Sequence, residues 1–204
     1  MNNKIKKFAY LTLFVSILIV MSIVPFLGYV PLGIINATTL HIPVILGSIL
    51  LGKKEGMILG FIFGLTSLIK ATFEPNATSF LFSPFFSFGN INGNFASLII
   101  AFGPRILLGY FSNVVYNLIK DKNENIAVIL GTFIGSMTNT ILVLSLAYIF
   151  FKDAYASALG IGSNMVLGFI MSIVFANGIT EALLAVIVIL AIYKATNKTF
   201  KRWR

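Results

Sequence analysis

Six apolar segments, joined by polar connections, take up most of this 204-residue chain. They cover residues 8–25, 42–51, 55–69, 95–119, 126–151 and 165–193. Apolar residues make up 58% of the chain and charged residues only 10%, against roughly 25% charged residues in soluble domains. Such a chain has too little polar surface to stay dissolved in water. The pattern predicts an all-α polytopic membrane protein, in which residues 1–204 form one six-transmembrane-helix bundle with long outer loops.

The first three segments differ from an ordinary membrane span. Segment 8–25 follows three lysines, as in a signal peptide, but its apolar run of about 18 residues exceeds the usual 7–15 and no A-x-A site follows. We therefore expect it to be retained as a span. Segments 42–51 and 55–69 are shorter than the roughly 20 residues that cross a bilayer alone. We expect them to be tilted, extended by flanking residues or buried among the other helices.

Lysine and arginine residues fall mostly on one side of the expected membrane. With the N-terminus in the cytoplasm, the outer segments contain only Lys70 and Lys152, and Arg105 lies inside a span. The inner segments contain Lys4, Lys6, Lys7, Lys53, Lys54, Lys120, Lys122, Lys194, Lys198, Lys201, Arg202 and Arg204. Positive residues collect in cytoplasmic connections, so we expect both termini in the cytoplasm. The net charge of +9 therefore reflects orientation rather than nucleic-acid binding, which would need a basic face with interleaved aromatic residues.

The three outer connections are longer than the inner ones and are rich in Pro, Gly, Asn and aromatic residues. The first contains YVPLGIINATTLHIPV, over residues 29–44, which carries two prolines and no Lys, Arg, Asp or Glu. Long loops carry binding residues more often than short ones, so this asymmetry indicates a site that opens to the outside. Asn36 and Asn76 each begin an N-A-T glycosylation pattern, which is a weak match at this length.

Polar side chains near the middle of the expected spans indicate a site or a structural network. Arg105 lies about 11 residues into its span, roughly 16 Å below the outer surface, where an Arg costs roughly 2.5–3.5 kcal/mol. The neighbouring Pro104 lacks a backbone N–H and leaves a carbonyl free nearby. Arg105 either receives a substrate carboxylate or phosphate, or pairs with Glu181. Asn139 and Asn177 lie at similar depth and either contact a substrate or bond neighbouring helices.

Gly56, Gly60 and Gly64 recur four residues apart in the third segment. This spacing places them on one helix face that a second helix can approach closely. The face either packs inside the protein or docks a second membrane protein.

The sequence contains no pattern typical of an enzyme or a metal protein. It has no cysteine and a single histidine, His41, with few carboxylates, so we expect no metal site. No Gly-rich phosphate loop, catalytic triad or pair of acids is present, so we expect no enzyme activity, no cofactor and no ATP site in this chain.

The arrangement resembles the substrate-binding S-component of energy-coupling factor (ECF) vitamin transporters over nearly the whole chain. The most specific parts are PLGIINATTLHIPVILGSILLG, EGMILGFIFGLTSLI, SFLFSPF and GPRILLGY, and the set looks most like the pantothenate-specific branch. The resemblance implies a cell-membrane subunit that binds a vitamin from the outside. A transmembrane coupling (T) subunit and two cytoplasmic ATPases would supply the motion and use the ATP. The resemblance also implies that the subunit topples in the membrane and that its first outer connection acts as a lid.

The resemblance further implies roles for individual residues. Arg105 would take the carboxylate of pantothenate, while Asn139 and Asn177 would bond its amide or hydroxyls. Aromatic residues such as Phe82 and Phe85 would cover its geminal methyl groups. The expected substrate-binding set is completed by Asn36, in the lid, and Glu181. Two alternatives stay open. The chain could be an S-component for a pyridoxine- or riboflavin-type vitamin, or a structural membrane protein without a substrate.

The docking face that the resemblance implies is only partly present. In this family the first span often carries A-x-x-x-A, but here Ala9 is followed four residues later by Leu13. Ser16 is only partly comparable in size. The glycines of the third segment are therefore expected to share the docking role with Ala9 and Ser16.

Overall fold

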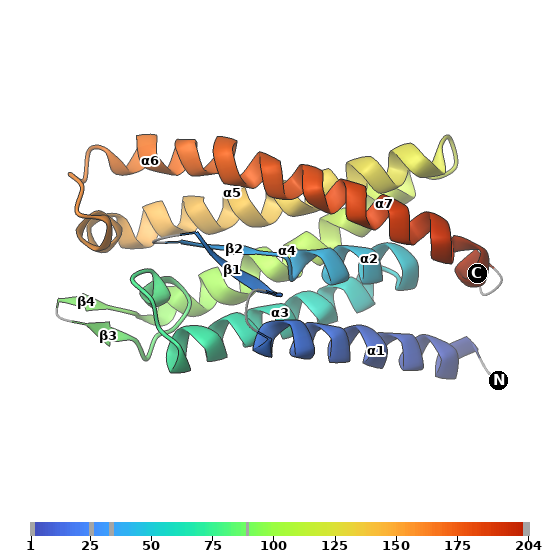
Figure 1. Ribbon diagram of the computed structural model, residues 1–204, viewed down its shortest axis with the longest axis horizontal. Helices are drawn as coiled ribbons and strands as arrows, with labels where there is room; N and C mark the ends of the chain where they lie inside the picture. The colour runs from blue at the N-terminus through green and yellow to red at the C-terminus, as the bar shows by residue number, and fades with distance from the viewer. Residues whose placement is uncertain (1–2, 25–26, 33–34, 89, 202–204) are drawn as a thin grey trace.

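The computed structural model describes residues 3–24, 27–32, 35–88 and 90–201. Helices form most of it, and the two antiparallel hairpins, β1–β2 and β3–β4, lie in connections between helices (Figure 1). In chain order the elements are α1 (Asn3–Ile23), β1 (Tyr29–Leu32), β2 (Ile35–Thr38), α2 (His41–Leu51), α3 (Lys53–Phe73), η1 (Ser79–Leu81), β3 (Ser87–Phe88), β4 (Ile91–Asn92), α4 (Phe95–Ile119), α5 (Glu124–Leu159), α6 (Val166–Ile173), η2 (Val174–Gly178) and α7 (Ile179–Lys201). The expected all-α membrane fold is confirmed.

Within the described residues, five helices are long and apolar enough to cross a membrane: α1, α3, α4, α5 and the continuous helix of α6, η2 and α7. A further apolar helix, α2, is shorter. Its 11 residues give a length of about 16 Å, which is about half the thickness of the hydrocarbon core of a bilayer. Ten of its 11 residues are buried, so the expectation that this segment is enclosed by the others is confirmed. A single residue, Gly52, joins α2 to α3 with a φ of 124°, a conformation that favours glycine.

The long helices lie side by side along the long axis of the molecule, with both termini at one end (Figure 1). The β3–β4 hairpin and the connection between α5 and α6 lie at the opposite end. The β1–β2 hairpin extends from the start of α2 toward that opposite end. Tyr29 pairs with Thr38 where the hairpin joins α1 and α2. The connection between α1 and α2, which was expected on the outside, therefore lies within the bundle, where it can cover an internal site.

The glycine face of α3 packs against α4. A Cβ atom added to Gly60 would lie 2.1 Å from the backbone oxygen of Arg105, and one added to Gly64 would lie 2.7 Å from that of Ala101. At the next turn, a Cβ on Gly56 would lie 2.9 Å from the backbone oxygen of Gly109. The glycine face of α3 therefore packs inside the protein, which is the first of the two predicted alternatives. A docking role for the three glycines would need surface that α4 already covers.

The two other residues expected to dock a partner lie on α1. Ala9 and Ser16 are both exposed, and most of α1 is exposed as well, because only Phe14 and Leu18 on it are buried. The docking role of Ala9 and Ser16 stays a prediction.

Candidate functional site

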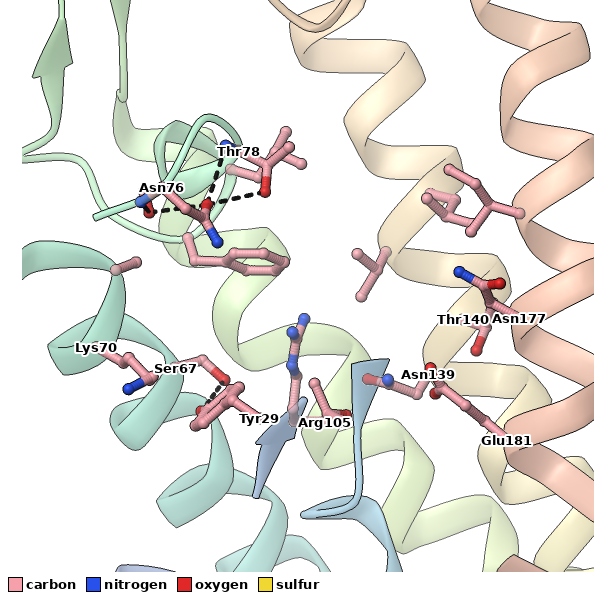
Figure 2. Close-up of a pocket in the computed structure, with 18 of the residues that line it drawn as sticks. Tyr29, Ser67, Lys70, Asn76, Thr78, Arg105, Asn139, Thr140, Asn177 and Glu181 are labelled. Carbon is pink, nitrogen blue, oxygen red and sulfur yellow. Dashed lines mark hydrogen bonds between the residues drawn. The ribbon is translucent and has the colours of Figure 1, made fainter. Parts of the chain in front are cut away.

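A pocket lies in the half of the bundle away from the termini, between the β1–β2 hairpin, α3, α4, α5 and α7 (Figure 2). It has an empty volume of about 1010 Å³, which includes its open mouth. On one side it is bounded by α3, with Ser67 and Lys70, and on the other by α5 and α7. Arg105 of α4 extends into the space between these walls.

Arg105 is held in place by a carbonyl that Pro104 leaves free. In a regular helix the N–H of residue 104 would bond the carbonyl of residue 100, but proline has no N–H. The guanidinium Nη1 of Arg105 instead donates to the backbone oxygen of Ile100, at 2.6 Å. The Pro-Arg pair thus supplies both the free acceptor and the donor that uses it.

The guanidinium of Arg105 is buried and still has an unused donor. Its side chain is only 4% exposed. Its central carbon lies 4.7 Å from the centre of the Phe82 ring and 5.4 Å from that of Phe63. The Nε atom has no hydrogen-bond partner among the described residues. A buried cation near two aromatic rings, with a free N–H, is suited to bind a carboxylate or phosphate.

The alternative pairing of Arg105 with Glu181 is not what the structure shows. Among the described residues, neither Arg105 nor Glu181 forms an ion pair, whereas Lys7 pairs with Glu55 and Lys70 with Glu74. Glu181 instead lies on the opposite wall of the pocket (Figure 2). The cationic group and this carboxylate are therefore both available to a bound molecule.

The wall opposite α3 gathers the other polar residues expected in the spans. Asn139 and Thr140 of α5, Asn177 of η2 and Glu181 of α7 all line the pocket. Asn177 lies in a π-helical turn, a local irregularity that often occurs at functional sites. The Oδ1 atom of Asn139 is buried and has no hydrogen-bond partner in the described structure. A buried acceptor without a partner suggests that a ligand completes this wall.

The rim of the pocket includes Asn76, Thr78 and Ser79, from a connection whose individual residues were not predicted to belong to the site. The side-chain oxygen of Asn76 accepts hydrogen bonds from the backbone N–H of Thr78, at 3.0 Å, and from the hydroxyls of Thr78 and Ser79, at 3.1 and 3.2 Å. The N-A-T pattern at Asn76, a weak match to a glycosylation site, forms an Asx turn that leads into η1. The preference of Asn for such turns was the signal that could have identified it.

A second polar cluster ties the hairpin to α3. The hydroxyl of Tyr29 lies 3.2 Å from the hydroxyl of Ser67 and 3.4 Å from that of Thr66. The ammonium of Lys70 lies 5.4 Å from the centre of the Tyr29 ring and also bonds Glu74 at 2.5 Å. Lys70 therefore places a second cation at the pocket, balanced by a carboxylate.

The remaining candidate residues have different surroundings. Phe82 lines the pocket and packs on Arg105, whereas Phe85 is 76% exposed and does not line it. The side chain of Asn36 lies outside the described residues, although the neighbouring Thr38 lines the pocket. Among the described residues, no group of three His, Cys, Asp or Glu lies close enough together to hold a metal ion.

The chain is similar to known proteins over almost its whole length. Residues 9–193 match the family described as "ECF transporter, substrate-specific component". The chain is 38% identical over 199 residues to the pantothenic acid transporter PanT of Lactococcus lactis subsp. cremoris, and the match covers 97% of this chain and 96% of the relative. It is 30% identical over 199 residues to the pantothenate transporter PanT of Leuconostoc mesenteroides subsp. mesenteroides, covering 94% and 92%.

Proposed function

This chain belongs to the family of substrate-specific components of ECF transporters, and from this premise we propose that it is the pantothenate-binding subunit of such a transporter. The names of the two relatives support pantothenate over a pyridoxine- or riboflavin-type vitamin. The family consists of transporter components, which argues against the structural membrane protein considered above.

The observation that carries the proposal is the distribution of polar groups around the pocket. Pantothenate has a carboxylate at one end, two hydroxyls at the other and an amide between them. The pocket has a buried Arg105 with a free Nε on one side. It has Asn139, Asn177 and Glu181 on the other. The order of charges and acceptors across the pocket therefore matches the order of groups along the vitamin.

In the proposed complex, the carboxylate accepts hydrogen bonds from Nε and a neighbouring N–H of Arg105, a bidentate arrangement that the guanidinium fork favours. The amide N–H donates to Oδ1 of Asn139, which has no other partner in the described structure. The hydroxyls bond Asn177 and Glu181. The geminal methyl groups pack against Leu144, which is buried at the same wall.

The β1–β2 hairpin is the proposed lid over this pocket. Tyr29 and Thr38, which pair at its base, both line the pocket. A lid must be polar enough for water when it opens, and should carry little charge if it enters the bilayer when the subunit topples. Residues 29–44 meet both demands, since their polar groups are uncharged.

Transport by this subunit would require partners. Since the sequence has no nucleotide-binding pattern, a T subunit and two cytoplasmic ATPases would supply the ATP-driven motion. The subunit would span the cell membrane several times with both termini in the cytoplasm, as its lysine distribution favours. The pocket then faces the outside in the resting orientation.

Vesicles test this division of labour. Vesicles that contain this chain alone should bind radiolabelled pantothenate without accumulating it. Vesicles that also contain the T subunit and both ATPases should accumulate it when ATP is supplied. Accumulation against a gradient by this chain alone, without ATP, would contradict the proposal.

A further inference from the structure

The charged side chains that line the pocket in the described part of the chain are Lys70, Glu74, Arg105 and Glu181. Lys70 and Glu74 neutralise each other, since the ammonium lies 2.5 Å from the carboxylate. Neither Arg105 nor Glu181 forms an ion pair with a described residue, and the two lie on opposite sides of the pocket (Figure 2). The pocket therefore has one cationic side and one anionic side.

The anionic side surrounds Glu181 with uncharged groups. Thr140 and Asn177 line the pocket beside it, and the backbone of Thr38, at the base of the lid, forms a hydrogen bond with its carboxylate. His41 interacts with the backbone of Glu181 and does not line the pocket. The carboxylate of Glu181 is thus held at the pocket wall, and no described cation shares that part of the lining.

The chemistry of the ligand gives this carboxylate a selective role. The argument at this step rests on the proposed function, in which the carboxylate of pantothenate binds Arg105 and its hydroxyls reach Asn177 and Glu181. A hydroxyl donates its proton to a carboxylate. A phosphate ester of that hydroxyl instead carries a charge of about −1.5 to −2 near pH 7 and strong acceptor oxygens. Two anions side by side in a site removed from water repel each other strongly.

Lack of space does not account for such a preference. The pocket has an empty volume of about 1010 Å³ including its mouth, and pockets for drug-sized ligands have about 300–1,000 Å³. A phosphate group therefore fits by volume alone. Discrimination has to come from charge, and Glu181 is the charged group at the hydroxyl end of the proposed complex.

We propose that Glu181 is a specificity-determining residue that admits the free vitamin and excludes its phosphate ester at the terminal hydroxyl. Arg105 requires an anion at one end of the ligand, and Glu181 requires an uncharged donor at the other end. The subunit thus selects monoanions with a hydroxylated end. A phosphate ester outside the cell has to be hydrolysed before this subunit binds it.

The test measures the binding of three probes to the purified full chain by titration calorimetry at about pH 8, where the phosphate is a dianion. The probes are pantothenate, its phosphate ester at the terminal hydroxyl, and its acetate ester at the same hydroxyl. Both esters lose the donor, but only the phosphate adds charge. The test variant is Glu181→Gln. Its matched control is Asp153→Asn, which removes one negative charge from an exposed position of α5 that does not line the pocket.

The native chain should bind the phosphate ester at least about 100-fold more weakly than pantothenate, and at least about tenfold more weakly than the acetate ester. Glu181→Gln should lower the discrimination against the phosphate ester at least about tenfold, while its pantothenate affinity stays within about tenfold of native because the amide still bonds a hydroxyl. Glu181→Asp should keep most of the discrimination, because the charge remains. Asp153→Asn should change it by at most about threefold.

Three results would overturn the proposal while the proposed function stands, because pantothenate still binds in each. Equal binding of the two esters by the native chain would assign the rejection to bulk or to the lost donor, and this result needs no variant to fold. Unchanged discrimination in Glu181→Gln would remove the residue from this role. An equal change in Asp153→Asn would show an effect of overall charge. Absence of pantothenate binding to the native chain would overturn the proposed function and this inference with it.

Discussion

Replacing Arg105 by alanine tests the site most sharply, because the structure defines what the residue would lose. The side chain is 4% exposed, so a carboxylate bound to it would be almost completely removed from water. Removing one partner of a buried, hydrogen-bonded charge pair costs about 2–5 kcal/mol, or about 30- to 4,000-fold in affinity. We expect Arg105→Ala to weaken pantothenate binding within this range, and Arg105→Lys to restore it only in part because the bidentate fork is lost.

The assay should compare pantothenate with pantothenol, in which an alcohol replaces the carboxylate. By calorimetry, the native protein should prefer pantothenate, and Arg105→Ala should remove most of this preference while binding pantothenol with little change. This comparison separates a lost charge contact from general damage to the pocket. If Arg105→Ala still prefers pantothenate to the same degree, Arg105 does not bind the carboxylate.

A double-mutant cycle with Glu181→Gln completes the test. Because the two side chains form no ion pair in the structure, their changes in thermal stability should add within about 0.5 kcal/mol. Strong coupling in stability, with unchanged affinity in the double variant, would instead support the structural pair and remove Arg105 from the site.

Three further substitutions test how the chain positions the site. Pro104→Ala should raise thermal stability, by up to about 3 kcal/mol. It should also weaken pantothenate binding, because the new N–H competes with Arg105 for the backbone oxygen of Ile100. Lower stability with unchanged affinity would contradict this expectation. Gly60→Ala should lower thermal stability by about 1–3 kcal/mol, since its Cβ would meet the backbone of α4. The control Gly168→Ala, with open space around its Cβ, should not lower thermal stability in this way. Equal effects of the two substitutions would refute the packing argument. Asn76→Ala should destabilise the pocket rim by about 0.5–2 kcal/mol in thermal unfolding, and Asn76→Asp should largely preserve it; equal loss in both would show that the acceptor oxygen is unimportant.

The sequence predicted helix bounds well where a polar residue caps the helix, and less well where a helix continues beyond its apolar run. The fourth segment was predicted at its observed bounds, and its start is capped by Asn94, whose side chain accepts from the N–H of Ala96 at 2.8 Å. By contrast, α5 continues past a break at Phe151 to Leu159, eight residues beyond the prediction. The residues after 151 include Lys152 and Asp153 and end the apolar run, but they still form helix. The end of an apolar run therefore does not mark the end of the helix.

Residues within the spans were predictable because each is energetically costly in a membrane. Arg105, Asn139, Asn177 and Glu181 were all expected at similar depth, and the structure brings them around one pocket. The sequence could not distinguish Glu181 from a backbone carbonyl as the partner of Arg105, since that depends on how distant helices pack. The free carbonyl itself was predictable from Pro104.

Residues of the outer loops were harder to predict because their positions depend on turns and long-range contacts. Phe85 was expected to contact a substrate but is 76% exposed and does not line the pocket. Tyr29 was expected at the pocket only as part of the lid, and its contact with Ser67, 38 positions further along the chain, was not predicted. Local composition identified these loops as polar and aromatic, but it contains no information on which aromatic residue faces inward.

The central claim is that this chain alone binds pantothenate, and titration calorimetry of the purified protein tests it most directly. Without ATP or partner subunits, pantothenate should bind at one site with submicromolar affinity, whereas pyridoxine and riboflavin should give no saturable heat. Absence of pantothenate binding together with tight binding of either other vitamin would contradict the account.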